Sequence, residues 1–249
     1  MTASLAIIGG TGLTELAGLS VCNLHETETP FGKTSSPVLE GEIDGVRLFF
    51  LPRHGHPHKV PPHLINYRAN IWALKNSGVT DILAVNAVGG ITPEMVPGAL
   101  VLPDQLIDYT YGREHTFFDG SFAPLHHIDF SQPYSAALAE RVLSAANAVQ
   151  ERLITGGTYG ATQGPRLETA AEISRMERDG CDIVGMTGMP EAALACEMDM
   201  RYVSLSLVVN WAAGKTEDEL TLEMMQVQLN IGMSRIRAII ARLACDSAQ

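Results

Sequence analysis

Short runs of apolar residues recur along the chain, and each ends at a glycine, a proline or a polar side chain. Runs of this length are typical of β-strands, and a continuously apolar one is typical of a strand covered on both faces of a sheet. The predicted strands span residues 5–8, 46–51, 81–86, 182–185 and 203–209. The last run is continuously apolar and leads directly into the polar Asn210.

Other segments space their apolar positions by three and four residues, as amphipathic helices do. One helix is predicted over 65–76, with Gly78 as its C-terminal stop. A second is predicted over 170–178, because Thr169 and Glu172 have the spacing of a capping box. That start places Glu168 just before the helix rather than on its buried face.

Two further helices complete the pattern. Pro190 favours the first turn of a helix that runs to residue 198. The C-terminal helix has an apolar stripe of Leu222, Met225, Leu229, Met233, Ile236, Ile240 and Leu243. Alternating strands and helices predict an α/β fold, and the chain has no linker or repeat, so we expect one domain over 1–249. Asn210 would then lie at the C-terminal end of a central strand, where such folds bind ligands.

Composition narrows the class of protein. The chain has 249 residues, 46% of them hydrophobic and 18% charged, which is typical of a globular protein. A formal net charge of −11 without a basic stripe argues against a nucleic-acid partner. No apolar run approaches the ~20 residues of a membrane span, and no signal peptide is expected. The four cysteines are scattered without a Cys-x-x-Cys pair, which favours reduced thiols in the cytoplasm.

Glu168 and Asn210 form the most informative pair of polar residues. A carboxylate accepts a hydrogen bond from a ring N–H, whereas an amide donates to one atom and accepts from another. Together they suit a 6-oxopurine, with Glu168 on N1–H and Asn210 donating to N7 or O6. Each residue also has a plainer interpretation: Glu168 as charge near a helix start, and Asn210 as a structural hydrogen bond to a loop.

The stretch Arg53-His54-Gly55-His56-Pro57-His58 admits three interpretations. Three histidines at alternate positions suit a metal, but an adjacent arginine disfavours a divalent cation and favours phosphate. Surface histidines without a function are the third possibility. Phosphate is the preferred interpretation on the local sequence.

Several turns could present backbone N–H groups to an anion. Residues 9–12 follow a predicted strand and include three glycines. They do not complete the dinucleotide-binding pattern, because Glu15 stands where its third glycine belongs. Residues 86–90 end another strand with small side chains, and a simple turn is equally compatible with them. Met186 and Thr187 precede the Pro190 helix, where a hydroxyl and N–H groups can face an anion.

Taken in order, these segments resemble the trimeric purine nucleoside phosphorylase and methylthioadenosine phosphorylase family over nearly the whole chain. The segments that carry the likeness are 9–13, 29–33, 53–55, 66–74, 104–108, 164–166 and 185–191. The resemblance implies a mixed central β-sheet flanked by helices. It also implies a homotrimer with sites near the subunit interfaces.

The resemblance assigns roles to individual residues. The residues implied for the phosphate shell are Thr11, Arg53, His54, Ala87 and Thr187. Met186 matches the residue under the ribose, and Leu167 is counted with the substrate contacts. Glu168 and Asn210 match the base-recognition pair of the 6-oxopurine branch. Adenine-specific members carry serine and aspartate at these two positions.

The pocket for the 5′ end of the sugar separates the remaining substrates. Inosine-cleaving members place a histidine at the position of Leu222, whereas Leu222 and Met225 would present apolar surface to a methylthio group. Both residues also belong to the apolar stripe of the C-terminal helix, so a core role stays open. His127 lies in a stretch that resembles the one a neighbouring subunit inserts into this pocket.

We therefore expect a cytoplasmic homotrimeric enzyme without a metal or other cofactor. It would use inorganic phosphate to convert 5′-methylthioinosine into hypoxanthine and 5-methylthioribose 1-phosphate. Four alternatives stay open: a phosphorylase of inosine or guanosine, a methylthioadenosine phosphorylase, a histidine-based metallohydrolase, and a non-catalytic purine-binding protein.

Overall fold

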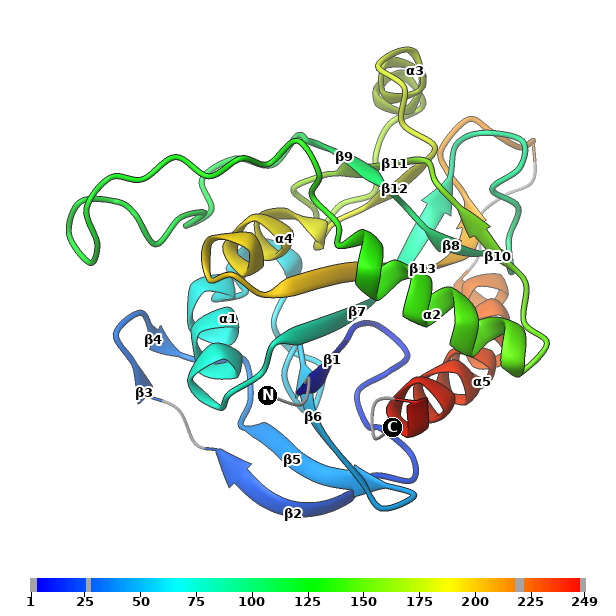
Figure 1. Cartoon of the computed structure of the whole chain (residues 1–249). Coiled ribbons are helices and arrows are strands. Elements are labelled where there is room, and N and C mark those ends of the chain that lie inside the picture. The colour runs from blue at the N-terminus through cyan, green and yellow to red at the C-terminus, as the bar shows by residue number, and fades with distance from the viewer. Residues whose placement is uncertain (1–3, 26–27, 218–221, 247–249) are drawn as a thin grey trace.

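The computed structural model describes residues 4–25, 28–217 and 222–246 (Figure 1). The strands are β1 (Leu5–Gly9), β2 (Ser20–His25), β3 (Glu28–Thr29), β4 (Gly32–Lys33), β5 (Val38–Ile43), β6 (Val46–Pro52), β7 (Asp81–Gly90), β8 (Leu100–Leu102), β9 (Gln105–Asp108), β10 (Leu153–Thr155), β11 (Thr158–Ala161), β12 (Ile183–Gly185) and β13 (Arg201–Trp211). The helices are α1 (Tyr67–Asn76), α2 (Ala136–Ala148), α3 (Ala170–Arg178), α4 (Gly188–Glu197) and α5 (Leu222–Asp246). A short 3₁₀ helix at Pro62–Leu64 precedes α1.

One mixed sheet organises the chain, as the resemblance implied. Its main path runs β10-β8-β13-β7-β1-β6-β5-β2, and β12, β11 and β9 extend it from β7. The four central strands β13, β7, β1 and β6 are parallel to one another. Their carboxyl ends therefore meet at the same edge of the sheet.

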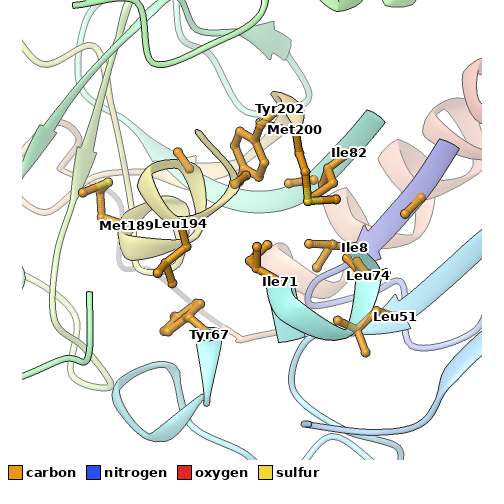
Figure 2. Packing of buried hydrophobic residues seen from close by; sticks show 14 of the residues in the cluster. Ile8, Leu51, Tyr67, Ile71, Leu74, Ile82, Met189, Leu194, Met200 and Tyr202 are labelled. Atoms are coloured by element: carbon orange, nitrogen blue, oxygen red, sulfur yellow. The ribbon is translucent and has the colours of Figure 1, made fainter. Parts of the chain in front are cut away.

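Helices cover both faces of the sheet, and β1 shows how the two cores are separated. Ala6 and Ile8 belong to the core under α1 and α4, whereas Leu5 and Ile7 belong to the core under α2 and α5. Successive strand residues point to opposite faces, so a continuous apolar run is what a doubly covered strand requires. Figure 2 shows the first core, to which Ile8 of β1, Ile71 and Leu74 of α1, and Leu194 of α4 all contribute.

The predicted helices are confirmed, with one shifted start. The side chain of Asn66 accepts from the Ala69 N–H and begins α1 at Tyr67, two residues later than expected. The capping box of Thr169 and Glu172 is present at α3. Met189 has non-helical angles inside α4, so the regular helix starts at Pro190 as predicted.

Residues 86–90 belong to a strand, so the simple turn that their sequence also allowed is not formed. Strand β7 continues through Gly90 and pairs with β13 as far as Trp211. A Cβ at Gly90 would lie 1.8 Å from the backbone oxygen of Met95, so the glycine permits a close approach of two backbones. In the part of the chain that the structure describes, no helix combines the length and apolarity needed to span a membrane.

Candidate functional site

A cavity of about 450 Å³ lies where the central parallel strands end. Segments that follow β1 and β6, the C-terminal halves of β7 and β13, and the connection from β12 to α4 line it. The loop before α3 and the first turns of α5 close its other sides. Its volume falls in the range of small-molecule sites.

The cavity brings together most of the residues singled out in the sequence. The predicted residues that line it are Thr11, Arg53, His54, Ala87, Leu167, Glu168, Met186, Thr187, Asn210 and Met225. They come from seven separate segments, so their meeting in one place is not a consequence of sequence proximity. The interpretation of Asn210 as a residue at the ligand-binding edge of the sheet agrees with this arrangement.

Two predicted residues are not placed at the cavity. The side chain of Leu222 lies outside the described part of the chain. His127 is exposed and lies in the segment between β9 and α2, which extends away from the sheet (Figure 1, green). Its contribution to the site of a neighbouring subunit stays a prediction.

Glu168 and Asn210 each have one hydrogen-bonding atom already engaged. Oε1 of Glu168 accepts a 2.5 Å bond from the hydroxyl of Thr162. Nδ2 of Asn210 donates a 2.6 Å bond to the carbonyl of Trp211. The pairing of β13 with β7 is irregular between Val208 and Asn210, and such a bulge redirects the side chains that follow it. One carboxylate oxygen and one amide N–H are left for a ligand.

Arg53 is buried in a bidentate ion pair that the sequence did not reveal. Its Nε and Nη2 donate to the two carboxylate oxygens of Glu191 at 2.7 and 2.8 Å, and its Nη1 donates to the carbonyl of Val85. Burial alone would lower the pKa of Arg53, but the Glu191 carboxylate outweighs it and raises the pKa. The hydroxyl of Tyr202 also donates to Glu191. The guanidinium of Arg53 is therefore fixed at the cavity wall, and the Glu191 carboxylate offsets part of its positive charge.

His54 is held as a neutral imidazole. Burial and the adjacent charge of Arg53 lower the pKa of His54 to about 4. Its Nδ1 lies 2.8 Å from the carbonyl of Val60, which can only accept, so Nδ1 carries the proton. Nε2 is left with a lone pair. At neutral pH this side chain can accept a hydrogen bond from a ligand.

A chain of buried hydrogen bonds reaches the cavity through Thr187. Its hydroxyl donates to Oδ1 of Asn86 at 2.9 Å, and Nδ2 of Asn86 donates to Ser204 at 2.7 Å. Ser204 is in turn 2.9 Å from Ser206. The proton of Thr187 is thereby committed to Asn86, so the hydroxyl oxygen faces a ligand as an acceptor.

Apolar side chains also line the cavity. Met225 and Leu229 of α5 line it together with Val209 and Ala212. Trp211 also lines the cavity, half-buried beside Asn210. These side chains suit a hydrophobic substituent rather than a charged group.

The histidine stretch is not arranged as a metal site. His54 and His58 stack with their ring centroids 4.3 Å apart, whereas His56 points to Glu15 at 3.6 Å. Across residues 4–25, 28–217 and 222–246, no group of three or more His, Cys, Asp or Glu side chains is placed to hold an ion.

Three residues at or behind the cavity were missed as site residues. Asn86 was predicted only as the end of a strand, although a buried amide inside an apolar run signals a required partner. Glu191 gave no signal of its own, because its partner Arg53 lies 138 residues away in the sequence. Thr162 lies only 6 residues from Glu168, but no local motif marks that spacing.

Comparison with known proteins shows similarity to phosphorylases over nearly the whole chain. The model of the phosphorylase superfamily matches residues 4–244. A probable S-methyl-5′-thioinosine phosphorylase of Pseudomonas syringae pv. tomato is 54% identical over 97% of this chain and 98% of its own. A 6-oxopurine nucleoside phosphorylase of Pyrococcus furiosus is 43% identical over 89% of this chain and 86% of its own. The methylthioadenosine phosphorylase of Schistosoma mansoni with adenine has a TM-score of 0.91 at 31% identity, over 98% of this chain and 91% of its own.

Proposed function

Because the chain belongs to the phosphorylase superfamily, we propose that it cleaves 5′-methylthioinosine with inorganic phosphate. The products are hypoxanthine and 5-methylthioribose 1-phosphate. One observation carries the proposal: a single cavity gathers a carboxylate and an amide for a 6-oxopurine, polar groups for phosphate, and apolar side chains for a methylthio group. The name of the relative from Pseudomonas syringae pv. tomato supports the same substrate.

The proposed mechanism needs no protein nucleophile and no cofactor. The glycosidic bond lengthens first, so positive charge develops on the sugar and negative charge on the purine. The free N–H of Asn210 donates to N7 or O6 and stabilises the negative charge on the departing base, while Glu168 accepts from N1–H and holds the base in place. Loss of one such donor typically costs roughly 100- to 1000-fold in turnover.

Phosphate, held by the polar groups of the cavity, then attacks C1′. Thr11, Ala87 and the charge of Arg53 orient it, and Met186 supports the ribose. His54 and Thr187 present acceptor atoms, so they suit a phosphate that still carries a proton. Fixed acceptors would orient the P–O–H group and leave an unprotonated oxygen to attack.

A second substrate class has specific support. The pair of Glu168 and Asn210 suits any 6-oxopurine, and the relative from Pyrococcus furiosus is named for such nucleosides. An apolar pocket separates close analogues by only about 10- to 200-fold, so slow turnover of inosine is expected. A 6-amino group would leave buried polar atoms unpaired and is discriminated against more strongly.

The decisive experiment measures release of the base from 5′-methylthioinosine, inosine and 5′-methylthioadenosine, with and without phosphate. We expect release of hypoxanthine that requires phosphate, ignores a chelator and is fastest with methylthioinosine. Hydrolysis that ignores phosphate and stops with chelator would identify a metallohydrolase. Binding of hypoxanthine without any consumption of nucleoside would identify a binding protein.

We also propose that the active form is a homotrimer in the cytoplasm. The extended segment that contains His127 is the part of the chain best placed to reach a neighbouring copy (Figure 1). Sedimentation at several concentrations measures the assembly, and a monomeric active enzyme would contradict it.

A further inference from the structure

The carboxylate of Glu168 depends on a partner at the other end of its own loop. Glu168 ends the loop between β11 and α3, and the adjacent Leu167 is 52% exposed. A glutamate side chain has three rotatable bonds, so an unrestrained carboxylate would sample many directions. The 2.5 Å hydrogen bond from Thr162 fixes the position of Oε1.

Thr162 is itself anchored by its backbone. Its N–H donates to the carbonyl of Gly185 at 2.8 Å. Its hydroxyl lies 2.5 Å from Glu168 but 3.3 Å from the Gly185 carbonyl, so its single proton goes to the carboxylate. A β-branched side chain on a fixed backbone is stiff at χ1, which gives the hydroxyl a defined direction.

Arg113 also connects this anchor to Met186, which lines the cavity. It is 8% exposed, and its Nη2 donates to the carbonyls of Thr162 and Gln163 at 3.1 and 2.9 Å. Its Nη1 donates to the carbonyl of Met186 at 2.9 Å. One guanidinium therefore fixes the start of the Glu168 loop relative to Met186.

From this geometry we propose that Thr162 is a positioning residue for base recognition. Its hydroxyl occupies Oε1 of Glu168 and leaves Oε2 to accept the N1–H of a 6-oxopurine. A carboxylate held in this orientation faces the N1 lone pair of a 6-aminopurine and repels it. Thr162 therefore contributes to the choice between the two classes of base, and this inference rests on the proposed function.

Paired substitutions test the proposal. Thr162→Val keeps the shape and removes the hydroxyl, whereas Thr162→Ser keeps the hydroxyl. Thr92→Val is the matched control, because Thr92 also bonds a carboxylate, but that of Asp182, which does not line the cavity as Glu168 does. We expect Thr162→Val to lower kcat/KM for methylthioinosine about 10- to 100-fold, the usual effect of a lost hydrogen bond to a charged group.

Selectivity distinguishes positioning from a structural role. We expect Thr162→Val to reduce the ratio of kcat/KM for methylthioinosine to that for methylthioadenosine, Thr162→Ser to restore it, and Thr92→Val to leave it unchanged. In a Glu168→Ala background, Thr162→Val should have almost no further effect on either substrate. Thermal unfolding of each variant monitors the fold, and comparison of Thr162→Ser with Thr162→Ala replaces Thr162→Val if the latter does not fold.

Two outcomes separate this inference from the proposed function. An equal loss of activity from Thr162→Val with and without Glu168, or an unchanged selectivity ratio, overturns the role of Thr162 alone. Absence of phosphate-dependent hypoxanthine release by the unmodified protein overturns the proposed function instead.

Discussion

Stability should fall between pH 6.5 and pH 4 because His54 is buried in its neutral form. Burial and Arg53 lower its pKa from 6.5 to about 4, while the unfolded chain keeps the ordinary value. Between these two values the unfolded state binds more protons than the folded state, so lower pH favours unfolding. The contribution is fully present above pH 6.5 and is lost as the pH falls through the folded pKa.

The size of the effect follows from the two pKa values. A shift of one unit corresponds to about 1.4 kcal/mol, so linkage at this site removes about 2 kcal/mol by pH 5 and about 3 kcal/mol by pH 4. His54 is 6% exposed, so solvent screening does not reduce this figure substantially. Such a loss is a large part of the free energy of unfolding of an ordinary domain.

Urea unfolding at one fixed protein concentration, from pH 7.5 to pH 4, measures this loss. His54→Gln removes the titrating group and keeps a side chain that can donate to the Val60 carbonyl. The free energy of unfolding of the unmodified protein should fall more steeply than that of His54→Gln, with the difference changing by about 3 kcal/mol. His56→Gln, at an exposed histidine two residues away, controls for the loss of an imidazole. Parallel pH curves for the unmodified protein and His54→Gln would refute a neutral, buried His54.

Three further substitutions test other parts of the site. Asn210→Asp should move the preference from methylthioinosine toward methylthioadenosine, because an aspartate accepts from a 6-amino group; an unchanged ratio of kcat/KM would remove Asn210 from base recognition. Leu222→His should lower the rate ratio of methylthioinosine to inosine, and a constant ratio would locate the 5′ pocket elsewhere. Glu191→Gln leaves the buried charge of Arg53 uncompensated and should cost about 3 kcal/mol in urea unfolding; a loss below about 1 kcal/mol would contradict the importance of this ion pair.

The convergence of the site was predictable because strands in such a sheet end together. Apolar runs identified the ends of β1 and β13, and Thr11 and Asn210 follow from those ends. The capping box at Thr169 identified the start of α3 and placed Glu168 in the loop before it. Local rules of this kind operate over a few residues, which is the range over which a single sequence is informative.

Partners that meet only through the fold were not predictable. Arg53 was interpreted as a free cation for phosphate, but Glu191 lies 138 residues away and pairs with it. No local pattern distinguishes a glutamate in the first turn of α4 that stabilises the helix from one that neutralises a buried arginine. Helix α2 was not predicted either, but for a different reason. Ser135 caps it and Leu138 and Val142 mark its buried face, so the sequence did contain its signal.

The electrostatics of the cavity indicate how an acidic chain could accept phosphate. Among the described residues that line the cavity, Arg53 alone carries a full positive charge, and Glu191 shares it. His54 is neutral, and the proton of Thr187 is committed to Asn86. Affinity for phosphate must then come from hydrogen bonds of defined direction, which are strong only where water is excluded. Such a site selects its anion by shape and proton position rather than by total charge, so it favours a small protonated oxyanion over a larger polyanion.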